Sequence, residues 1–168
     1  MKNSLLNEII GIIGLVLLQG LVLNNVALFG YLNPYIYLVV ILTLPPQFGN
    51  IRLMFVGFFL GFTIDIFENS GALHASATTF LAFIRPSLLR LVATQGGEEF
   101  GRLNLSTMGT SKFLIYSAFG VIFHHIWLFT LETFKFLELP QVFFRSLLSG
   151  AFSLTLILLL QLLLYRRN

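Results

Sequence analysis

Cysteine is absent from this chain of 168 residues, which excludes disulfides, thiolate zinc sites and iron–sulfur clusters. Charged residues are scarce as well, at 10% of the sequence against roughly 25% in an average soluble domain. A surface that faces water needs more charge than this, whereas a surface that faces lipid needs almost none. The scarcity of charge therefore argues against an ordinary soluble protein and indicates an integral membrane protein.

Several functional signatures are also missing. The ten Lys and Arg are spread along the chain and form no dense basic stripe, so the net charge of +3 does not indicate a nucleic-acid partner. The sequence contains no Walker-type phosphate loop and no paired-His zinc motif, and no serine has a base at motif spacing. It contains no sequence repeat that would support an inverted-repeat transporter. We therefore expect no enzyme activity and no cofactor.

The chain is rich in hydrophobic runs, with 57% hydrophobic residues and a mean hydropathy of +0.88. A helix of roughly 20 apolar residues crosses the hydrocarbon core of a bilayer. We predict a single all-α membrane domain, a six-helix bundle. Its spans are residues 5–23, 34–44, 53–67, 71–92, 113–130 and 142–165. Residues 93–112, rich in Gly, Ser, Thr, Asn and Glu, are the one long polar segment and predict a water-facing cytoplasmic loop.

The run 34–44 is short for a span. Pro34 suits the first turn of a helix, and a pair of prolines ends the run. Tyr31, Tyr35 and Tyr37 at its start are typical of aromatic side chains at a membrane interface. The segment could be tilted, re-entrant or extended by its flanks.

The distribution of Lys and Arg predicts the orientation. Six spans place both termini on one side, which then carries eight of these residues, while Lys135 and Arg145 lie on the other. The positive-inside rule puts the richer side, and hence both termini, in the cytoplasm. Omitting the short run 34–44 would mix the two sets, so the asymmetry favours six spans over five.

The densest pattern is GFFLGFTID at residues 57–65. Gly57, Gly61 and Asp65 share one helix face, and glycines at this spacing allow a neighbouring backbone to approach closely. Asp65 is either a ligand for a proton, a cation or a substrate, or a structural group that pairs with a neighbour at the helix end or caps the next helix across a short turn. His74 begins that next helix, and we expect a hydrogen bond between it and Asp65. Two such ligands are too few to predict a metal site.

Two adjacent histidines occupy the run 113–130. Since neighbouring helical residues point about 100° apart, we expect one of His124 and His125 to face the bundle and the other a neighbour or the interface. Glu132 lies on the stripe of His124 and would close a polar line at the outer end. Both histidines are interpreted as polar contacts between helices. Trp127 fits an interfacial anchor.

Arginine marks two further positions. Arg85 is expected to extend to lipid headgroups at the cytoplasmic end of its span, and Pro86 to break the helix or start the next one. Arg145 is the exception on the outer side, and a pair with Glu132 or Glu138 would explain it.

The sequence resembles a known family in these same positions. Residues 57–67 (GFFLGFTIDIF), 71–75 (GALHA) and 81–86 (LAFIRP) resemble the bacterial rod-shape-determining protein MreD family, with its Gly-rich third helix ending in Asp, a short turn with Gly and a small-residue fourth helix. The length and the six-span layout match as well.

The resemblance implies a non-enzymatic scaffold in the bacterial inner membrane that takes part in cell elongation and rod-shape determination. It implies MreC, whose bulk is periplasmic, as the direct partner. MreB, RodA and the elongation transpeptidase, which build lateral peptidoglycan, are indirect partners. It also implies a fold similar to the substrate-binding subunits of energy-coupling-factor vitamin transporters. The candidate packing or interface residues are then Gly57, Gly61, Asp65, Gly71, His74, Arg85 and Pro86.

That fold similarity provides the alternative function, a subunit that binds a vitamin-like small molecule for a membrane transporter. Such a pocket would need convergent polar groups. Asp65, His74, His124 and Glu132 are the candidates for its lining.

Overall fold

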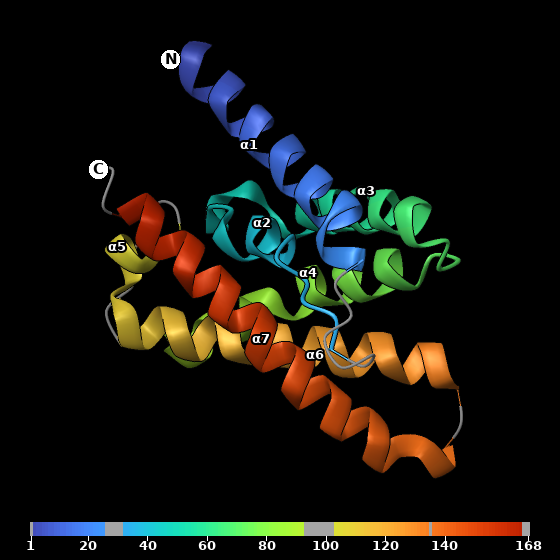
Figure 1. Cartoon of the computed structure of the whole chain (residues 1–168). Helices are drawn as coiled ribbons and strands as arrows, with labels where there is room; N and C mark the ends of the chain where they lie inside the picture. The colour runs from blue at the N-terminus through green and yellow to red at the C-terminus, as the bar shows by residue number, and fades with distance from the viewer. Residues whose placement is uncertain (1, 26–31, 93–102, 135, 166–168) are drawn as a thin grey trace.

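A computed structural model of the chain describes residues 2–25, 32–92, 103–134 and 136–165 (Figure 1). This part of the chain is helical and contains no strand. Short 3-10 turns lie at Leu23–Asn25, Pro46–Phe48 and Phe136–Glu138. The α-helices are α1 (Lys2–Leu21), α2 (Leu38–Thr43), α3 (Asn50–Glu68), α4 (Leu73–Val92), α5 (Leu105–Met108), α6 (Thr110–Thr133) and α7 (Leu139–Tyr165).

Four helical segments in the described part are long and apolar enough to cross a membrane. They are Glu8–Asn25, Asn50–Glu68, Thr110–Thr133 and Leu139–Leu164. The prediction of an all-α protein with membrane-spanning helices is confirmed by the length and the composition of these helices. The fourth predicted span, α4, has 20 residues and a length of about 30 Å, but it is not apolar enough to count among the four.

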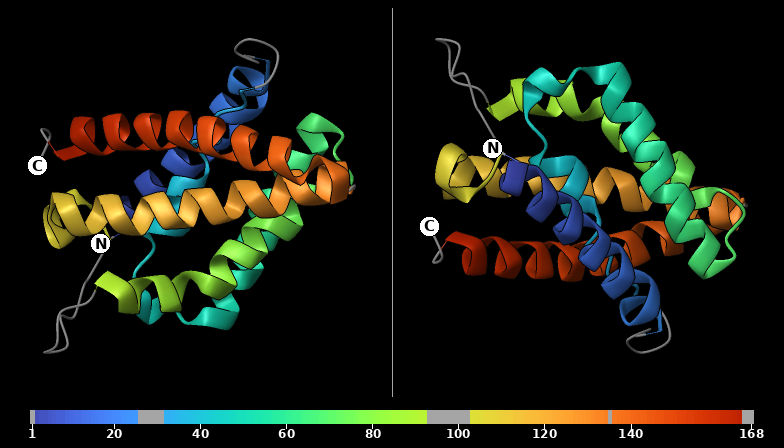
Figure 2. Two further views of the ribbon diagram at one scale, coloured as in Figure 1. Left: turned by 90° about the horizontal axis from the view of Figure 1, so that it is seen from below. Right: turned by 90° about the horizontal axis from the view of Figure 1, so that it is seen from above.

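The helices form a bundle in which α4 lies between α3 and α6, and α7 packs along α6 (Figure 2). The turn from α3 to α4 lies at the same end of the bundle as the end of α6 and the start of α7, whereas α5 lies at the opposite end (Figures 1 and 2). Helix α1 projects from the bundle (Figure 1), and only 11% of its apolar window is buried. Its exposed apolar surface suits contact with lipid.

The second predicted span differs from its prediction. Residues 34–42 are all buried, but only Leu38–Thr43 is α-helical, too short to span a membrane as a helix. Pro34 does not sit in a first helical turn, because it precedes α2 in a non-helical stretch. Tyr35 and Tyr37 are 2% and 0% exposed, so they are core residues rather than interfacial anchors. Tyr31 lies outside the described residues.

Helix α4 is continuous from Leu73 to Val92, so Pro86 neither breaks a helix nor starts one. Proline removes one backbone hydrogen bond and clashes with the carbonyl four residues earlier. The helix persists because residues on both sides of the proline, such as Ala82 and Leu88, are buried in the bundle. Packing against neighbouring helices is what allows proline inside membrane helices.

The predicted polar loop is shorter than expected where it can be followed. Residues 93–102 lie outside the described residues, whereas Leu105–Met108 forms α5 and Thr110 begins α6. Asn104 caps α5 by accepting a hydrogen bond from the Thr107 amide at 2.9 Å. Leu103, Leu105 and Met108 are buried and cover the core, whereas Ser106 and Thr107 between them are exposed, so only one side of this part of the loop can face water. Arg102, Lys135, Arg166 and Arg167, which contribute to the charge asymmetry, are also outside the described residues.

Candidate functional site

The glycine pattern in α3 makes the closest helix contact of the site. A Cβ atom on Gly61 would lie 2.3 Å from the backbone oxygen of His74, and one on Gly57 would lie 2.9 Å from that of Thr78. Real Cβ atoms do not approach backbone atoms this closely, so the packing of α3 against α4 requires glycine at position 61. This face of α3 is covered by α4 and belongs to the interior of the protein.

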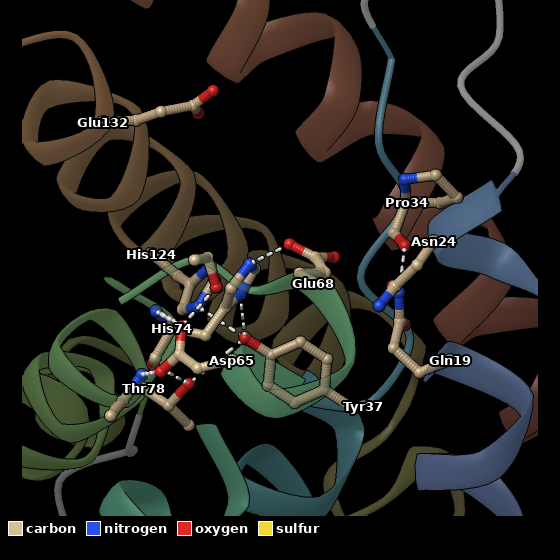
Figure 3. Close-up of polar contacts among 12 residues, drawn as sticks. Gln19, Asn24, Pro34, Tyr37, Asp65, Glu68, His74, Thr78, His124 and Glu132 are labelled. Atoms are coloured by element: carbon tan, nitrogen blue, oxygen red, sulfur yellow. Dashed lines mark hydrogen bonds and ion pairs between the residues drawn. The ribbon is translucent and has the colours of Figure 1, made fainter. Parts of the chain in front are cut away.

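Asp65 ends the same face and caps α4 (Figure 3). Its Oδ1 atom accepts hydrogen bonds from the His74 amide at 2.9 Å and from the Ser70 hydroxyl, and its Oδ2 atom accepts one from the Ala75 amide at 2.8 Å. Unpaired amides at a helix N-terminus attract a carboxylate. The capping interpretation of Asp65 is therefore correct, and the bond to His74 is made by its backbone amide rather than by its ring.

The turn closed by Asp65 has an unusual backbone. Asn69, Gly71 and Ala72 have positive φ angles of 54°, 63° and 70°. Glycine and asparagine tolerate this region, but alanine adopts it at a cost of about 1–3 kcal/mol. Asp65 holds the amides of His74 and Ala75, two and three residues after Ala72, and this fixes the start of α4.

The hydroxyl of Tyr37 lies at the centre of a buried polar cluster (Figure 3). It is 3.0 Å from His74 Nδ1, 3.1 Å from His124 Nε2 and 3.2 Å from Thr78 Oγ1. On its other side, the His74 ring contacts Glu68, with Nε2 2.6 Å from Oε2. We call Tyr37, Glu68, His74, Thr78 and His124 the Tyr37 cluster; its residues come from α3, α4, α6 and the stretch before α2.

Both histidines of α6 are buried inside the bundle, and neither faces an interface. His124 contacts Tyr37 through Nε2, while its Nδ1 atom is buried without a hydrogen-bond partner. The His125 Nδ1 atom is 2.8 Å from the Val121 carbonyl, and its Nε2 atom is 3.1 Å from the Ser153 hydroxyl. The two rings therefore point in different directions, with His124 toward Tyr37 and His125 toward the neighbouring helix α7, which is one of the two predicted alternatives; neither ring reaches an interface with the surroundings.

The non-helical stretch before α2 is held by side chains of α1 and α7. The Gln19 amide donates to the Pro34 carbonyl at 2.9 Å, and its oxygen accepts from the Ile36 amide at 2.9 Å. The Tyr35 amide donates to the Ser153 hydroxyl at 2.8 Å. Backbone away from water must find such partners within the protein. These contacts place Tyr37 opposite His74 and His124.

Arg85 is 3% exposed and does not extend to lipid headgroups. Its Nε atom donates to the Tyr116 hydroxyl at 2.8 Å, and Nη2 donates to the Leu44 carbonyl. Tyr116 in turn donates to the Leu42 carbonyl at 2.9 Å. The expectation of a surface anchor is therefore overturned, because Arg85 joins α4 to α6 and to the end of α2.

Glu132 lies apart from the Tyr37 cluster and does not extend a polar line from His124 (Figure 3). It accepts a hydrogen bond from Arg145 Nη1 at 3.0 Å, which confirms one of the two pairs expected for Arg145. The guanidinium also lies 3.9 Å above the Phe129 ring. Trp127 is 39% exposed and donates to the Ser76 hydroxyl at 3.0 Å.

The structure thus brings Asp65, His74 and His124 near one another and leaves Glu132 outside. Sequence reasoning missed Tyr37, Glu68, Thr78 and Gln19. Of these four residues, only Glu68 could have been found from the sequence. It lies six residues before His74 across a short turn, and an acid at that spacing can reach the histidine ring. Within the described residues, no group of three or more His, Asp or Glu is arranged to hold a metal ion.

No protein-family model, curated protein or solved structure matches the chain.

Proposed function

We propose that the chain is a non-enzymatic scaffold of the bacterial cell-elongation machinery, of the MreD type, which binds an MreC-like single-span protein in the inner membrane. The observation that carries the proposal is the α3–α4 hairpin. The residues that resemble the family have structural roles there: Gly61 allows the close backbone contact, Asp65 caps α4, and Arg85 joins neighbouring helices. A motif used for packing is what a scaffold requires.

The exposed apolar surface also supports the proposal. Phe55, Phe59 and Ile66 on the outer face of α3 are 62%, 63% and 67% exposed, and α1 is exposed over most of its length. In a membrane, such faces contact lipid or a single helix of another protein. The buried polar groups of the hairpin, by contrast, are engaged with the chain itself.

We further propose that α4 and the segment 34–44 complete six passes, with both termini in the cytoplasm and a fold like that of energy-coupling-factor substrate-binding subunits. The length of α4 is sufficient for one pass. Its lower hydropathy is compatible with a pass because α4 lies between α3 and α6, where its polar residues His74, Thr78 and Arg85 are buried. The eight-to-two distribution of Lys and Arg supports the orientation.

The test is deletion and co-purification. In a rod-shaped bacterium that carries this gene, we expect deletion to round the cells and the tagged chain to retain the MreC-like protein through detergent purification. Re-expression of the wild-type chain serves as the control and should restore rods. Normal rods after deletion, together with loss of the MreC-like protein during purification, would refute the scaffold function.

The transporter alternative has less support. Of its four proposed pocket residues, Asp65 and His74 are bonded within the chain, and Glu132 pairs with Arg145. A vitamin that produced large, saturable thermal stabilisation of the purified protein would favour this alternative over the scaffold.

A further inference from the structure

The hydroxyl of Tyr37 has more hydrogen-bonding neighbours than it has hydrogens. It lies within 3.2 Å of His74 Nδ1, His124 Nε2 and Thr78 Oγ1. A phenol donates one hydrogen bond and accepts up to two. The single proton of Tyr37 can therefore point to His74 or to Thr78, and the choice depends on the protonation of the His74 ring.

Glu68 determines which nitrogen of His74 carries a proton. Its Oε2 atom lies 2.6 Å from His74 Nε2, and an ionised carboxylate only accepts hydrogen bonds. Nε2 therefore carries a hydrogen, and Nδ1 is the position that a further proton can occupy. The Glu68 side chain is 19% exposed, against 2% for His74, so it connects the buried ring to the surface.

The Tyr37 cluster satisfies both protonation states of His74. When the ring is neutral, Tyr37 donates to Nδ1. When the ring is an imidazolium, Nδ1–H donates to Tyr37, and Tyr37 donates to Thr78. The Thr78 hydroxyl can accept this bond because its own proton is donated to the His74 carbonyl at 2.8 Å. His124 is assigned its hydrogen on Nε2, because its buried Nδ1 atom has no acceptor, and Nε2–H then donates to Tyr37 in both states.

We propose that His74 is a buried proton-binding site, built by Glu68 as counter-charge and by the Tyr37 hydroxyl, which turns from His74 to Thr78 when the ring takes up a proton. The proton comes from a hydronium ion. One O–H bond of that ion breaks, and one N–H bond forms at Nδ1. The site does not depend on the identity of any partner protein.

The other two histidines lack these features. A proton on His124 Nδ1 would create a buried N–H without an acceptor, which is costly, whereas a bare lone pair there costs less. His125 is bonded to the Val121 carbonyl and the Ser153 hydroxyl, and no hydrogen bond to a carboxylate is found for it among the described residues. Among the described residues, His74 is therefore the histidine that has a carboxylate bonded to its ring to stabilise an imidazolium.

The remaining titratable neighbours of the His74 ring leave this assignment unchanged. Asp65 adds a second carboxylate, but its oxygens are occupied by the amides of α4 and by Ser70. Tyr35 stacks edge-on, 4.8 Å from the ring centroid. On α7, Arg145 is engaged with Glu132. The titratable groups near the ring are Asp65 and Glu68 from α3, Tyr35 and Tyr37 from the stretch before α2, and His124 and His125 from α6. Arg145 on α7 acts electrostatically on Tyr35 and His125.

The test is nitrogen NMR of the full chain in lipid nanodiscs, with ¹⁵N-labelled histidine. The sequence has three histidines, so the ring signals can be assigned by substitution. On acidification, we expect His74 alone to change from one protonated ring nitrogen to two, while His124 and His125 keep one each. The proposal is overturned if His74 keeps one ring proton throughout the pH range in which the protein stays folded, or if another histidine is protonated first.

A matched pair of variants separates the site from a simple Glu68–His74 ion pair. Thr78→Val removes the acceptor that Tyr37 needs in the charged state and should lower the pH of half-protonation of His74 by about 0.7, a roughly fivefold weaker affinity, as expected for one lost hydrogen bond. Thr79→Val is the control, because Thr79 bonds the Ala75 carbonyl in the same way but does not contact Tyr37. Equal titration of the two variants would exclude the role of Tyr37 and Thr78. If Thr78→Val does not fold, the assignment of the three wild-type histidines decides.

Discussion

At the scale of single residues, several buried polar side chains of this protein join two elements each. Asp65 connects α3 to α4, Arg85 connects α4 to α6, and Gln19 connects α1 to the stretch before α2. The sequence identified Asp65 because an acid on a glycine face at a helix end is unusual. It did not identify Tyr37, because a tyrosine at the start of a hydrophobic run looks the same whether it faces an interface or two distant histidines.

The residue-scale prediction concerns Gly61. Gly61→Ala should lower the free energy of unfolding by about 1–3 kcal/mol or more, because the added methyl group meets the His74 backbone, which cannot rotate away. The thermal stability of the detergent-solubilised protein measures this.

Gly11→Ala is the matched control, since a Cβ atom there has nothing within 4 Å. Alanine is the better helix former, so this variant should be unchanged or slightly more stable. Equal stability of the Gly61 and Gly11 variants would show that the close α3–α4 contact is absent.

At the scale of elements, the stretch before α2 is the unusual feature. It is buried and non-helical, so its backbone depends on side chains from α1 and α7 rather than on its own helix. Sequence analysis predicted a continuous helix there because hydrophobicity and Pro34 favour one. The run of hydrophobic residues gave no sign that Gln19 and Ser153 would supply the hydrogen bonds.

The element-scale prediction tests this dependence. Gln19→Leu would leave the Pro34 carbonyl and the Ile36 amide buried without their partner, and each such loss costs about 1–3 kcal/mol. We expect a clear drop in the melting temperature. Gln161→Leu is the control, since Gln161 is also a buried glutamine in a helix but has no hydrogen bond among the described residues. A Gln19 variant as stable as the Gln161 variant would contradict the prediction.

At the scale of the whole molecule, the number of passes decides how the bundle sits in the membrane. Four helical segments qualify by length and apolar composition, and the proposed topology adds α4 and the segment 34–44. Under that topology, the α3–α4 turn and the α6–α7 turn lie on the outer side, and α5 lies on the cytoplasmic side. The placement of these elements at opposite ends of the bundle is compatible with it (Figure 2).

Labelling of single cysteines tests this topology, and the natural absence of cysteine makes a clean background. We expect Asn69→Cys and Leu137→Cys to react with an impermeant maleimide in intact cells, and Ser106→Cys to react only after permeabilisation. If Asn69→Cys and Ser106→Cys are labelled from the same side of the membrane, α4 does not cross it. A fully inverted pattern would keep the six passes and reverse the predicted orientation.

The sequence by itself determined the all-helical membrane class, the approximate positions of the long apolar helices and the position of the glycine face that ends in Asp65. These follow from local properties, since hydropathy over a 20-residue window and spacing on one helix need no knowledge of neighbours. Only the tertiary structure decided that α2 is a six-residue helix, that α4 runs through Pro86, that Arg85 is buried, and that Glu68, His74, Tyr37 and His124 meet. Each of these depends on a partner distant in the chain, because a buried polar group or an interrupted helix is stable only where another element supplies its hydrogen bonds or its packing.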